Sequence, residues 1–317
     1  MATWLLAAML TIGAAAVVIH FVNANVYGPE QQVAGYLEAL QEGNGERALG
    51  LLGAKVPDSN AVLLDDAGLA ASTADLQVLE VSEAARSAND RADVRARYIL
   101  GGEERESSFR LTRTEKQWLF FDRWSFAPST LPTVTVTAAS QREATVNGVR
   151  VALPAETTTF AAFYPTRVEA SYTSEFLAAP AASGIVGSAA DTVDLVLTTE
   201  ATEALKTAVD ARVRDFLDGC TSARDRLAPP GCPFFHFTDN QVQPPIVWTI
   251  TEYPTVDIRN VAGKWVLSPL TGKARLTATQ TDLFSGMKSP LTVEKEFSFA
   301  ARLSMGSGEV TVTPLID

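Results

Sequence analysis

The longest uninterrupted run of apolar residues lies at the start of the chain, from Ala2 to Val22, and contains no Asp, Glu, Lys or Arg. A helix of about 20 residues rises roughly 30 Å, which is enough to cross the hydrocarbon core of a bilayer. The pair Gly28-Pro29 then stops the helix. This pattern predicts a transmembrane anchor over residues 1–28, held in the membrane by lipid contacts.

A cleaved signal peptide is the alternative interpretation of this apolar run. Val22 and Ala24 stand where a signal peptidase reads small residues. The run is longer than the usual apolar region of a signal peptide, about 7–15 residues, and no basic segment precedes it. The first Lys or Arg is Arg47, so we expect a basic cytoplasmic segment upstream of Met1. The pattern favours the anchor, and a secreted protein stays open as the alternative.

Residues 29–127 combine two amphipathic helices with a run of strands. Apolar residues recur at the i, i+3, i+4 and i+7 spacing of a helix at Val33, Tyr36, Leu37 and Leu40. This spacing predicts a helix over residues 29–43, and GERALGLLGA predicts a second helix over 45–54. Strands are predicted over residues 76–81, 94–100, 107–112 and 118–124, with turns at Gly101-Gly102 and Thr114-Glu115. Helices before an antiparallel meander predict an α+β domain.

Residues 128–198 contain short alternating runs and no helical pattern. Strands are predicted over residues 133–138, 143–153, 158–162, 167–172 and 191–198. Asn147-Gly148 predicts a tight hairpin, because both turn residues need a positive φ. Tyr164-Pro165-Thr166 is predicted to turn the strand at 158–162 back onto the strand at 167–172. These short strands predict a small β-sandwich or barrel.

Residues 199–317 repeat the order of one helix followed by a meander. A single apolar stripe predicts a helix over residues 199–219, capped by Thr198 or Thr199 and ended by Gly219. Strands are predicted over residues 246–253, 255–261, 264–268, 272–284, 291–304 and 309–315. This segment is therefore predicted to be a second α+β domain, a helix with an antiparallel sheet.

Two cysteines, Cys220 and Cys232, enclose a loop with three prolines. At this spacing a disulfide would stabilise the fold by roughly 3 kcal/mol in the loop-entropy model. Two unrelated reduced thiols are the alternative. A zinc site lacks further ligands, because His236 is the only histidine nearby. Since disulfides persist outside the cytosol, the pair predicts that residues after about 25 are extracytoplasmic.

Sequence segments resemble known bacterial families. Residues 37–52 and 109–124 resemble the NTF2-like fold of envelope proteins, which implies an α+β cone. VNGVRV and FYPTRVEASY resemble PEGA-like β modules, and residues 199–317 resemble an NTF2-like or cystatin-like domain. The order of anchor, cone, β module and Cys-bearing domain resembles the TcaA-like membrane proteins of Gram-positive bacteria. That resemblance implies a cell-wall-linked envelope protein.

The charge distribution excludes one class of partner. All 37 acidic and 26 basic residues lie from Glu30 onward, and the net charge is −11. A general nucleic-acid binder needs a basic face to neutralise phosphates, so we expect no nucleic-acid partner.

Candidate catalytic groups are few, and each has a simpler structural interpretation. His236 lies among aromatic residues and is predicted to be a packed imidazole. Ser285 and Lys288 match S-x-x-K, but no K-T-G strand follows, so a turn is predicted there. The acidic run at residues 103–106 is predicted to be a solvated hairpin tip, and Asp122-Arg123 a satisfied polar pair or an edge position. We therefore predict no catalytic, cofactor or metal site.

These patterns predict a non-enzymatic, single-pass, membrane-anchored envelope protein that presents binding domains to a cell-wall component or an envelope protein. The alternative is an NTF2-like pocket that binds a ligand or acts on envelope precursors. A polar cluster inside the cone would favour the pocket, and a cone filled with apolar residues would favour the interaction role.

Overall fold

The computed structural model describes residues 27–316 apart from five short gaps. The gaps are residue 65 and residues 88–89, 118–120, 262–263 and 306–308. Before residue 27, only residues 9, 13–14 and 17–18 are described. The predicted anchor over residues 1–28 thus lies almost wholly outside the described residues. Within the described part, no helix is both long enough and apolar enough to span a membrane.

The chain folds into two compact units, and the fold is α+β with more strand than helix. The first unit comprises residues up to 172 together with 180–198, and the second comprises residues 173–179 and 199–317. The segments 29–127 and 128–198 lie largely in the first unit. The segment 199–317 makes up most of the second.

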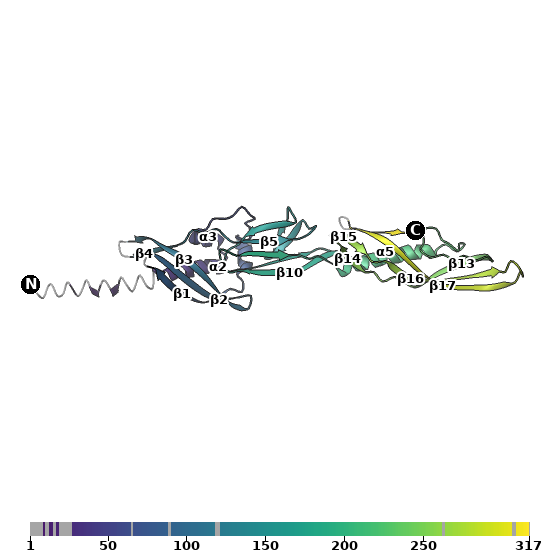
Figure 1. Ribbon diagram of the computed structural model, residues 1–317, viewed down its shortest axis with the longest axis horizontal. Coiled ribbons are helices and arrows are strands. Elements are labelled where there is room, and N and C mark those ends of the chain that lie inside the picture. Colours follow the sequence, from purple (N-terminus) through teal and green to yellow (C-terminus); the bar gives the residue numbers. More distant parts are fainter. Residues whose placement is uncertain are drawn as a thin grey trace, which may run out of the picture. The chain divides into compact units, whose positions relative to one another are not determined.

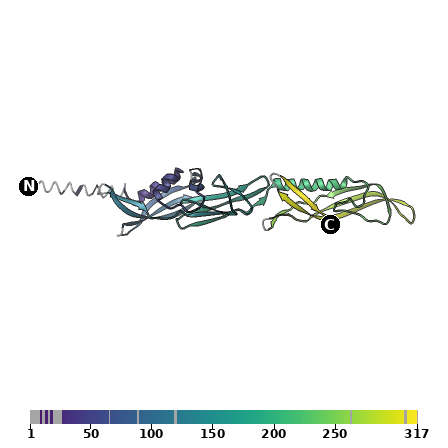
Figure 2. The same ribbon diagram turned by 90° about the horizontal axis from the view of Figure 1, so that it is seen from above.

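The first unit begins with helices that lie on one face of a four-stranded antiparallel sheet (Figures 1 and 2). The helices are α2 (Pro29–Gln41), α3 (Gly45–Leu52), the 3₁₀ turn η1 (Val62–Leu64) and α4 (Asp66–Ser72). The strands, in their order across the sheet, are β1 (Gln77–Ser87), β2 (Arg91–Leu100), β3 (Glu103–Gln117) and β4 (Phe121–Phe126). The two predicted helices are confirmed, whereas η1 and α4 were not predicted.

Local signals in the sequence set the ends of these elements. The Asn44 side chain accepts a hydrogen bond from the Arg47 N–H at 2.9 Å and so caps α3. Gly53, with a φ of 61°, ends it. The predicted turn at Thr114-Glu115 is wrong, because a register shift between Arg113 and Glu115 absorbs an extra residue and keeps the chain in β3.

Aromatic side chains fill the space between α2 and the sheet. Tyr36 of α2 is fully buried, and its ring centroid lies 5.8 Å from that of Phe109 and 5.5 Å from that of Phe126. Its hydroxyl donates a hydrogen bond to the Tyr164 carbonyl oxygen at 2.7 Å. Burial raises the pKa of Tyr36 well above its ordinary value, so this hydroxyl stays protonated and donates. This cluster is the part of the first unit's core that lies between α2 and the sheet.

Two further sheets complete this part of the chain. Their strands are β5 (Thr133–Thr137), β6 (Glu143–Val146), β7 (Val149–Ala152), β8 (Thr157–Ala161), β9 (Thr166–Thr173), β10 (Leu177–Val186), β11 (Thr192–Val196) and β12 (Glu200–Ala201). One sheet has the order β12-β10-β9-β6-β7, and the other β11-β5-β8. The predicted strands are present, and β10 and β12 were not predicted.

The predicted pairing of the strand at 158–162 with the strand at 167–172 is wrong, because β8 and β9 belong to different sheets. Residues 160–166, which join them, are all buried. The Thr166 hydroxyl donates to the Phe163 carbonyl oxygen at 2.6 Å inside this segment. The chain therefore passes through the core here instead of turning back at the surface.

The predicted Asn147-Gly148 hairpin is confirmed, but its first residue is buried. Asn147 has a φ of 46° and Gly148 a φ of 76°. The Asn147 amide donates to the Ser72 hydroxyl of α4 at 2.5 Å, and its oxygen accepts from the Glu169 N–H at 2.7 Å. The turn thus ties the β6–β7 hairpin to the helical part of the unit. A second hydrogen bond links β3 to the residue after β10, because the Ser107 hydroxyl donates to the Gly187 carbonyl oxygen at 2.5 Å.

The second unit packs one long helix, α5 (Glu203–Thr221), against one face of a sheet (Figure 2). The strands are β13 (Gln241–Glu252), β14 (Ile258–Val261), β15 (Lys264–Leu267), β16 (Leu270–Thr281), β17 (Lys288–Met305) and β18 (Val310–Leu315). The sheet has the order β13-β16-β17-β18, and β14 pairs with β15 as a separate ribbon.

The helix starts later than predicted. Thr202 caps α5 by accepting a hydrogen bond from the Leu205 N–H at 3.3 Å. Thr198 and Thr199 do not cap it, because Glu200–Ala201 forms the strand β12 directly before the helix. The helix also continues past the predicted end at Gly219 to Thr221. The predicted apolar stripe is confirmed as the buried face of α5 at Leu205, Val209, Val213 and Leu217.

We predict that Asn147→Gly destabilises the first unit by about 2 kcal/mol, because it leaves the buried groups around the turn unpaired. Glycine keeps the left-handed backbone, so the change isolates the lost side-chain hydrogen bonds. Hydrogen-exchange mass spectrometry, read on peptides from the first unit, measures the loss. Ser140→Gly is the matched control, since Ser140 also has a positive φ of 63° but is exposed. Equal effects of the two changes would contradict the role of the Asn147 side chain.

Candidate interaction surface

The disulfide predicted between Cys220 and Cys232 is present, with Cα atoms 5.8 Å apart. Cys220 lies in the last turn of α5, and Cys232 lies in the segment before β13. The Cys220 side chain is part of the buried core of the second unit. The disulfide therefore links the irregular segment before β13, at Cys232, to the end of the packed helix α5.

The segment after Cys232 runs along the sheet toward the end where β16 meets β17. Phe234 is buried, with its ring centroid 4.9 Å from that of Trp248 and 5.6 Å from that of Phe297. Farther on, the Asn240 amide donates to the Gln280 side-chain oxygen at 3.3 Å. The disulfide, Phe234 and Asn240 thus hold the segment at its start, middle and end.

Two phenylalanines of this segment face solvent. Phe235 is 53% exposed and Phe237 is 78% exposed, while Phe234 between Cys232 and the pair is buried. The ring centroids of Phe235 and Phe237 lie 5.0 Å apart. We call these two side chains the aromatic shelf. Such an exposed aromatic pair on a held backbone is typical of protein-binding surfaces.

A groove of about 550 Å³ adjoins the shelf at Phe235. It is lined by Cys232, Pro233, Phe235, Pro269, Ser298, Phe299, Ala300, Leu315 and Ile316. None of these side chains carries a charge, and Ser298 supplies the only side-chain hydroxyl. We call this feature the apolar groove. The name refers to its side chains, because backbone polar atoms also contribute to the exposed surface of the groove.

The turn between β16 and β17 exposes a third set of apolar side chains. Leu283 is 69% exposed, Met287 is 70% exposed and Phe284 is fully exposed. We call these three residues the apolar tip; Figure 1 shows the hairpin that carries them reaching the end of the second unit. The predicted strand over 272–284 is therefore too long, since β16 ends at Thr281.

Asp282 organises this turn. Its carboxylate accepts hydrogen bonds from the Ser285 N–H at 2.7 Å and the Ser285 hydroxyl at 2.8 Å. These bonds lower the pKa of Asp282, the Ser285 N–H contributing most, so the carboxylate is ionised at neutral pH. The predicted turn at Ser285–Lys288 is confirmed, and Ser285 serves the turn geometry through these contacts.

His236 is half-buried and turned toward the sheet. Burial, and then the positive charge of Lys295, lower the pKa of His236 below its ordinary value. Within the described part of the chain its Nδ1 atom is buried without a hydrogen-bond partner. This imidazole is therefore neutral at pH 7, and its placement agrees with the predicted packed role.

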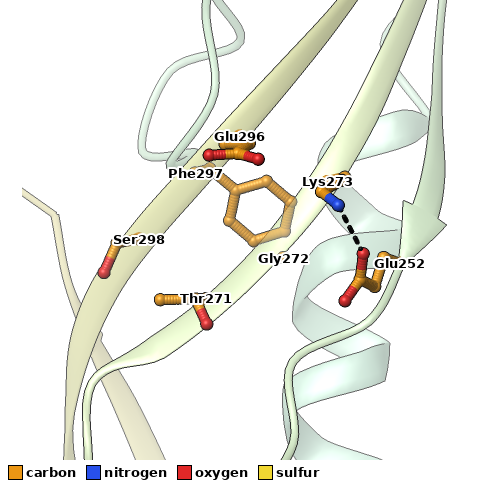
Figure 3. Close-up of a pocket in the computed structure, with 7 residues that line it drawn as sticks. All are labelled: Glu252, Thr271, Gly272, Lys273, Glu296, Phe297 and Ser298. Carbon is orange, nitrogen blue, oxygen red and sulfur yellow. Dashed lines mark ion pairs between the residues drawn. The ribbon is translucent and has the colours of Figure 1, made fainter.

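A second pocket, of about 360 Å³, lies where β16 and β17 approach the end of β13 (Figure 3). The Phe297 ring lies over Gly272, whose missing side chain makes room for it. Lys273 Nζ lies 3.0 Å from Glu252 Oε2, and both side chains are exposed. The lysine is thus paired by a surface salt bridge, and the pocket offers a ligand only weak electrostatic attraction.

The other predicted polar features lie in the first unit and have structural partners. Asp122 accepts a hydrogen bond from Arg113 at 3.1 Å, while Arg123 is exposed. The acidic run at 103–106 is exposed at the start of β3, where Glu106 pairs with Arg95 at 2.8 Å. Among the residues that the structure describes, no cluster of three or more His, Cys, Asp or Glu side chains could hold a metal ion.

Sequence reasoning missed the aromatic shelf and the apolar tip. The signal was present, because both FFHF and LFSGM place large apolar residues beside turn-forming Pro, Ser and Gly. Apolar residues in turns lack a sheet or helix period that would bury them, so an exposed position could have been inferred.

We predict that a thiol reagent labels no cysteine in the native chain and labels both Cys220 and Cys232 after reduction. Mass spectrometry counts the labels. Because Cys220 is buried, labelling is repeated in denaturant without reductant, which exposes a free thiol but leaves a disulfide intact. Labelling of the denatured, unreduced chain would contradict the bond.

We predict that Lys295→Met raises the pKa of His236 toward its ordinary value, because one of the two causes of the depression is removed. The stabilisation linked to the neutral ring is complete above about pH 6.5 and is lost as the pH falls through the pKa of the folded state. NMR titration measures the pKa, with His20→Asn removing the other histidine. Lys288→Met is the control and should leave the pKa of His236 unchanged. A His236 pKa in the native chain equal to that of an ordinary histidine would contradict the burial of its ring.

Comparison with known proteins finds no match: no family model, no curated protein and no solved structure is similar to this chain.

Proposed function

We propose that the chain is a membrane-anchored envelope protein whose second unit binds a partner protein through the aromatic shelf and the apolar groove. The observation that carries this proposal is the exposure of Phe235 and Phe237 on a segment held by a disulfide and by buried Phe234. Exposed aromatic side chains are in contact with water in the free protein. Covering them with a partner removes this apolar surface from water, which stabilises the complex. A held backbone lowers the entropy that binding costs.

The chemistry of the apolar groove favours a protein over a cell-wall glycan. A glycan presents many hydroxyl groups that need hydrogen-bond partners once they leave water. Among the described residues that line the groove, Ser298 alone has a side-chain hydroxyl, so a glycan would depend on backbone groups for its hydrogen bonds. An apolar side chain from a protein needs no such partner, so an envelope protein is the proposed ligand.

The filling of the first unit supports an interaction role over a ligand pocket. Tyr36, Phe109 and Phe126 occupy the space between α2 and the sheet with their ring centroids within 5.8 Å of one another. The same face of the sheet also holds a buried polar pair, because the Tyr98 and Ser107 hydroxyls lie 2.7 Å apart and the Ser107 hydroxyl donates to the Gly187 carbonyl oxygen. These hydroxyls are satisfied within the protein, so the packed aromatic rings fill most of the described space behind α2. This filling supports the proposed interaction role over an NTF2-like pocket acting on envelope precursors.

The location is also a proposal. The apolar run from Ala2 to Val22 supplies the anchor, and the disulfide between Cys220 and Cys232 agrees with an oxidising, extracytoplasmic site for the second unit. In this proposal the first unit is an NTF2-like domain with a PEGA-like module, and the whole is TcaA-like in order. A secreted protein remains the alternative, and a mature chain that starts at Asn25 would support it.

We predict that a photo-crosslinking residue placed at Phe237 captures an envelope protein in intact cells, because a bound partner covers the aromatic shelf. The same residue placed at Thr279, which is exposed on the polar face of β16, is the matched control. Mass spectrometry identifies the captured protein. Equal capture at both positions would contradict the shelf as a binding surface, and capture of cytosolic proteins alone would contradict the location.

A further inference from the structure

We propose that an extended segment of the partner protein, in which basic and apolar residues alternate, pairs as an added strand with residues 291–298 of β17. We call this stretch of β17 the open edge. The inference rests on the proposed function, because it names how the partner occupies the apolar groove beside the aromatic shelf.

The open edge has a neighbouring strand on one side only. Residues 288–299 of β17 pair with β16, and residues 300–305 pair with β18 on the opposite side. In the described part of the chain, no strand pairs with the open edge on the side away from β16. Figure 3 shows Glu296 and Ser298 along this part of β17, with β16 beside it. An exposed strand edge of this length is a template for pairing with another chain.

Two prolines show which backbone groups point into the open edge. In an antiparallel sheet, successive residues direct their N–H and C=O groups alternately to the two sides of the strand. Pro290 lies opposite Thr279 of β16, and Pro314 of β18 lies opposite Ala301. A proline has no N–H, so its nitrogen sits where it faces away from the neighbouring strand. Both prolines therefore indicate that the even-numbered residues of β17 direct their backbone groups away from β16.

Three residues of the open edge thus present backbone groups to a partner. Thr292, Glu294 and Glu296 are exposed, and within the described part of the chain no loop or turn hydrogen bond reaches their backbone. The next residue in the series, Ser298, lines the apolar groove together with Phe299. The polar surface of the groove therefore includes a strand edge. An added strand pairs with such backbone groups and places its own side chains among apolar ones.

The charges on the outer face of the open edge favour a basic partner. Glu294 pairs with Arg275 of β16 at 2.9 Å, whereas Glu296 forms no ion pair among the described residues. Residues directly opposite each other on neighbouring strands share one face of the sheet, and opposite charges there stabilise the pair. A Lys or Arg opposite Glu296 would therefore stabilise an added strand.

The same charges disfavour a second copy of this chain as the added strand. An antiparallel pair of open edges centred on Glu294 or Glu296 puts that glutamate opposite its own copy. A pair centred on Lys295 puts Glu294 opposite Glu296. Like charges directly opposite each other destabilise a pair of strands, and the net charge of −11 adds to the repulsion between copies.

The inner face of the open edge favours apolar residues between the basic ones. Side chains alternate between the two faces of a strand, so these residues turn to the face of Val293 and Phe297. Lys295 is the one charged residue of the open edge on this face, so the apolar residues fit best on either side of it. Near Ser298 they reach the apolar groove, which Phe235 of the aromatic shelf also lines.

The first measurement tests the open edge in the free chain. Amide hydrogen exchange is followed by NMR on the detergent-solubilised full chain with isotope-labelled Thr, Glu, Val and Lys. We expect fast exchange at Thr292, Glu294 and Glu296, and slow exchange at Val293 and Lys295, whose N–H groups face β16. Equal protection of the two sets would overturn the strand geometry. Protection of the first set that grows with protein concentration would mean pairing with a second copy and would overturn the proposed occupant.

The second measurement adds a probe of the proposed chemistry, a terminally blocked peptide of about nine residues in which Lys alternates with Val. We expect the peptide to protect the amides of Thr292, Glu294 and Glu296. N-methylation of two lysine backbone nitrogens should abolish this protection, because the residues opposite the glutamates pair with β17 through those N–H groups. N-methylation of two valine nitrogens is the matched control, since those groups face solvent. Equal binding of the two methylated peptides would overturn the inference.

A charge variant of the chain tests the outer face. Glu296→Lys should weaken binding of the Lys-Val peptide about tenfold, because a cross-strand attraction becomes a repulsion. Glu309→Lys is the matched control, since it changes the net charge equally at an exposed residue directly before β18. Isothermal titration calorimetry measures both affinities. An equal loss in the two variants would mean that net charge alone attracts the peptide and would overturn the role of the open edge.

The outcomes separate this inference from the proposed function. Specific capture of an envelope protein at Phe237, without protection of the open edge by the Lys-Val peptide, would support the binding surface and overturn the strand addition. Protection of the open edge by the peptide, with equal photo-capture at Phe237 and Thr279, would support the strand addition and overturn the role of the aromatic shelf.

Discussion

The burial of Phe234 between Trp248 and Phe297 is the contact on which the surface of the second unit depends. The other contacts of the segment from Cys232 to Asn240 are those at its two ends and the hydrogen bond from the His236 N–H to the Leu227 carbonyl oxygen at 3.0 Å. The burial of Phe234 fixes the orientation of the segment, so that Phe234 faces the sheet while Phe235 and Phe237 face solvent. A single buried ring thereby fixes which aromatic side chains a partner can reach, and the disulfide at Cys232 sets where the segment starts.

The first unit depends on a different constraint, the satisfaction of buried polar groups. Tyr36, Asn147 and Ser107 each carry a polar group into a buried or half-buried site, and each finds a partner far away in the sequence. A buried polar group that lacks its partner destabilises the fold, so these pairs favour one arrangement of the helices and sheets over others. The helical part and most of the strand residues between 128 and 198 are joined in this way into one compact unit.

Charged side chains and exposed apolar side chains occupy different parts of the surface of the second unit. The outer face of β16 and β17 carries charged side chains such as Lys273, Arg275 and Glu294, and these form surface ion pairs of low energy. The aromatic shelf, the apolar groove and the apolar tip have no such charges. In a strongly acidic chain, neutral apolar sites are where contact with another acidic protein costs least, and this is why we assign binding to them.

The sequence by itself determined the helices at 29–43 and 45–54, most of the strands, the Asn147-Gly148 turn and the pairing of Cys220 with Cys232, because these follow from local periodicity, turn chemistry and loop length. Tertiary structure decided which strands pair, so that β8 and β9 separate although they are adjacent in the chain. It also decided that Thr202 caps α5, and that Phe235, Phe237 and Phe284 are exposed. Exposure and pairing depend on which surfaces meet across distant parts of the chain, and local sequence carries little of that information.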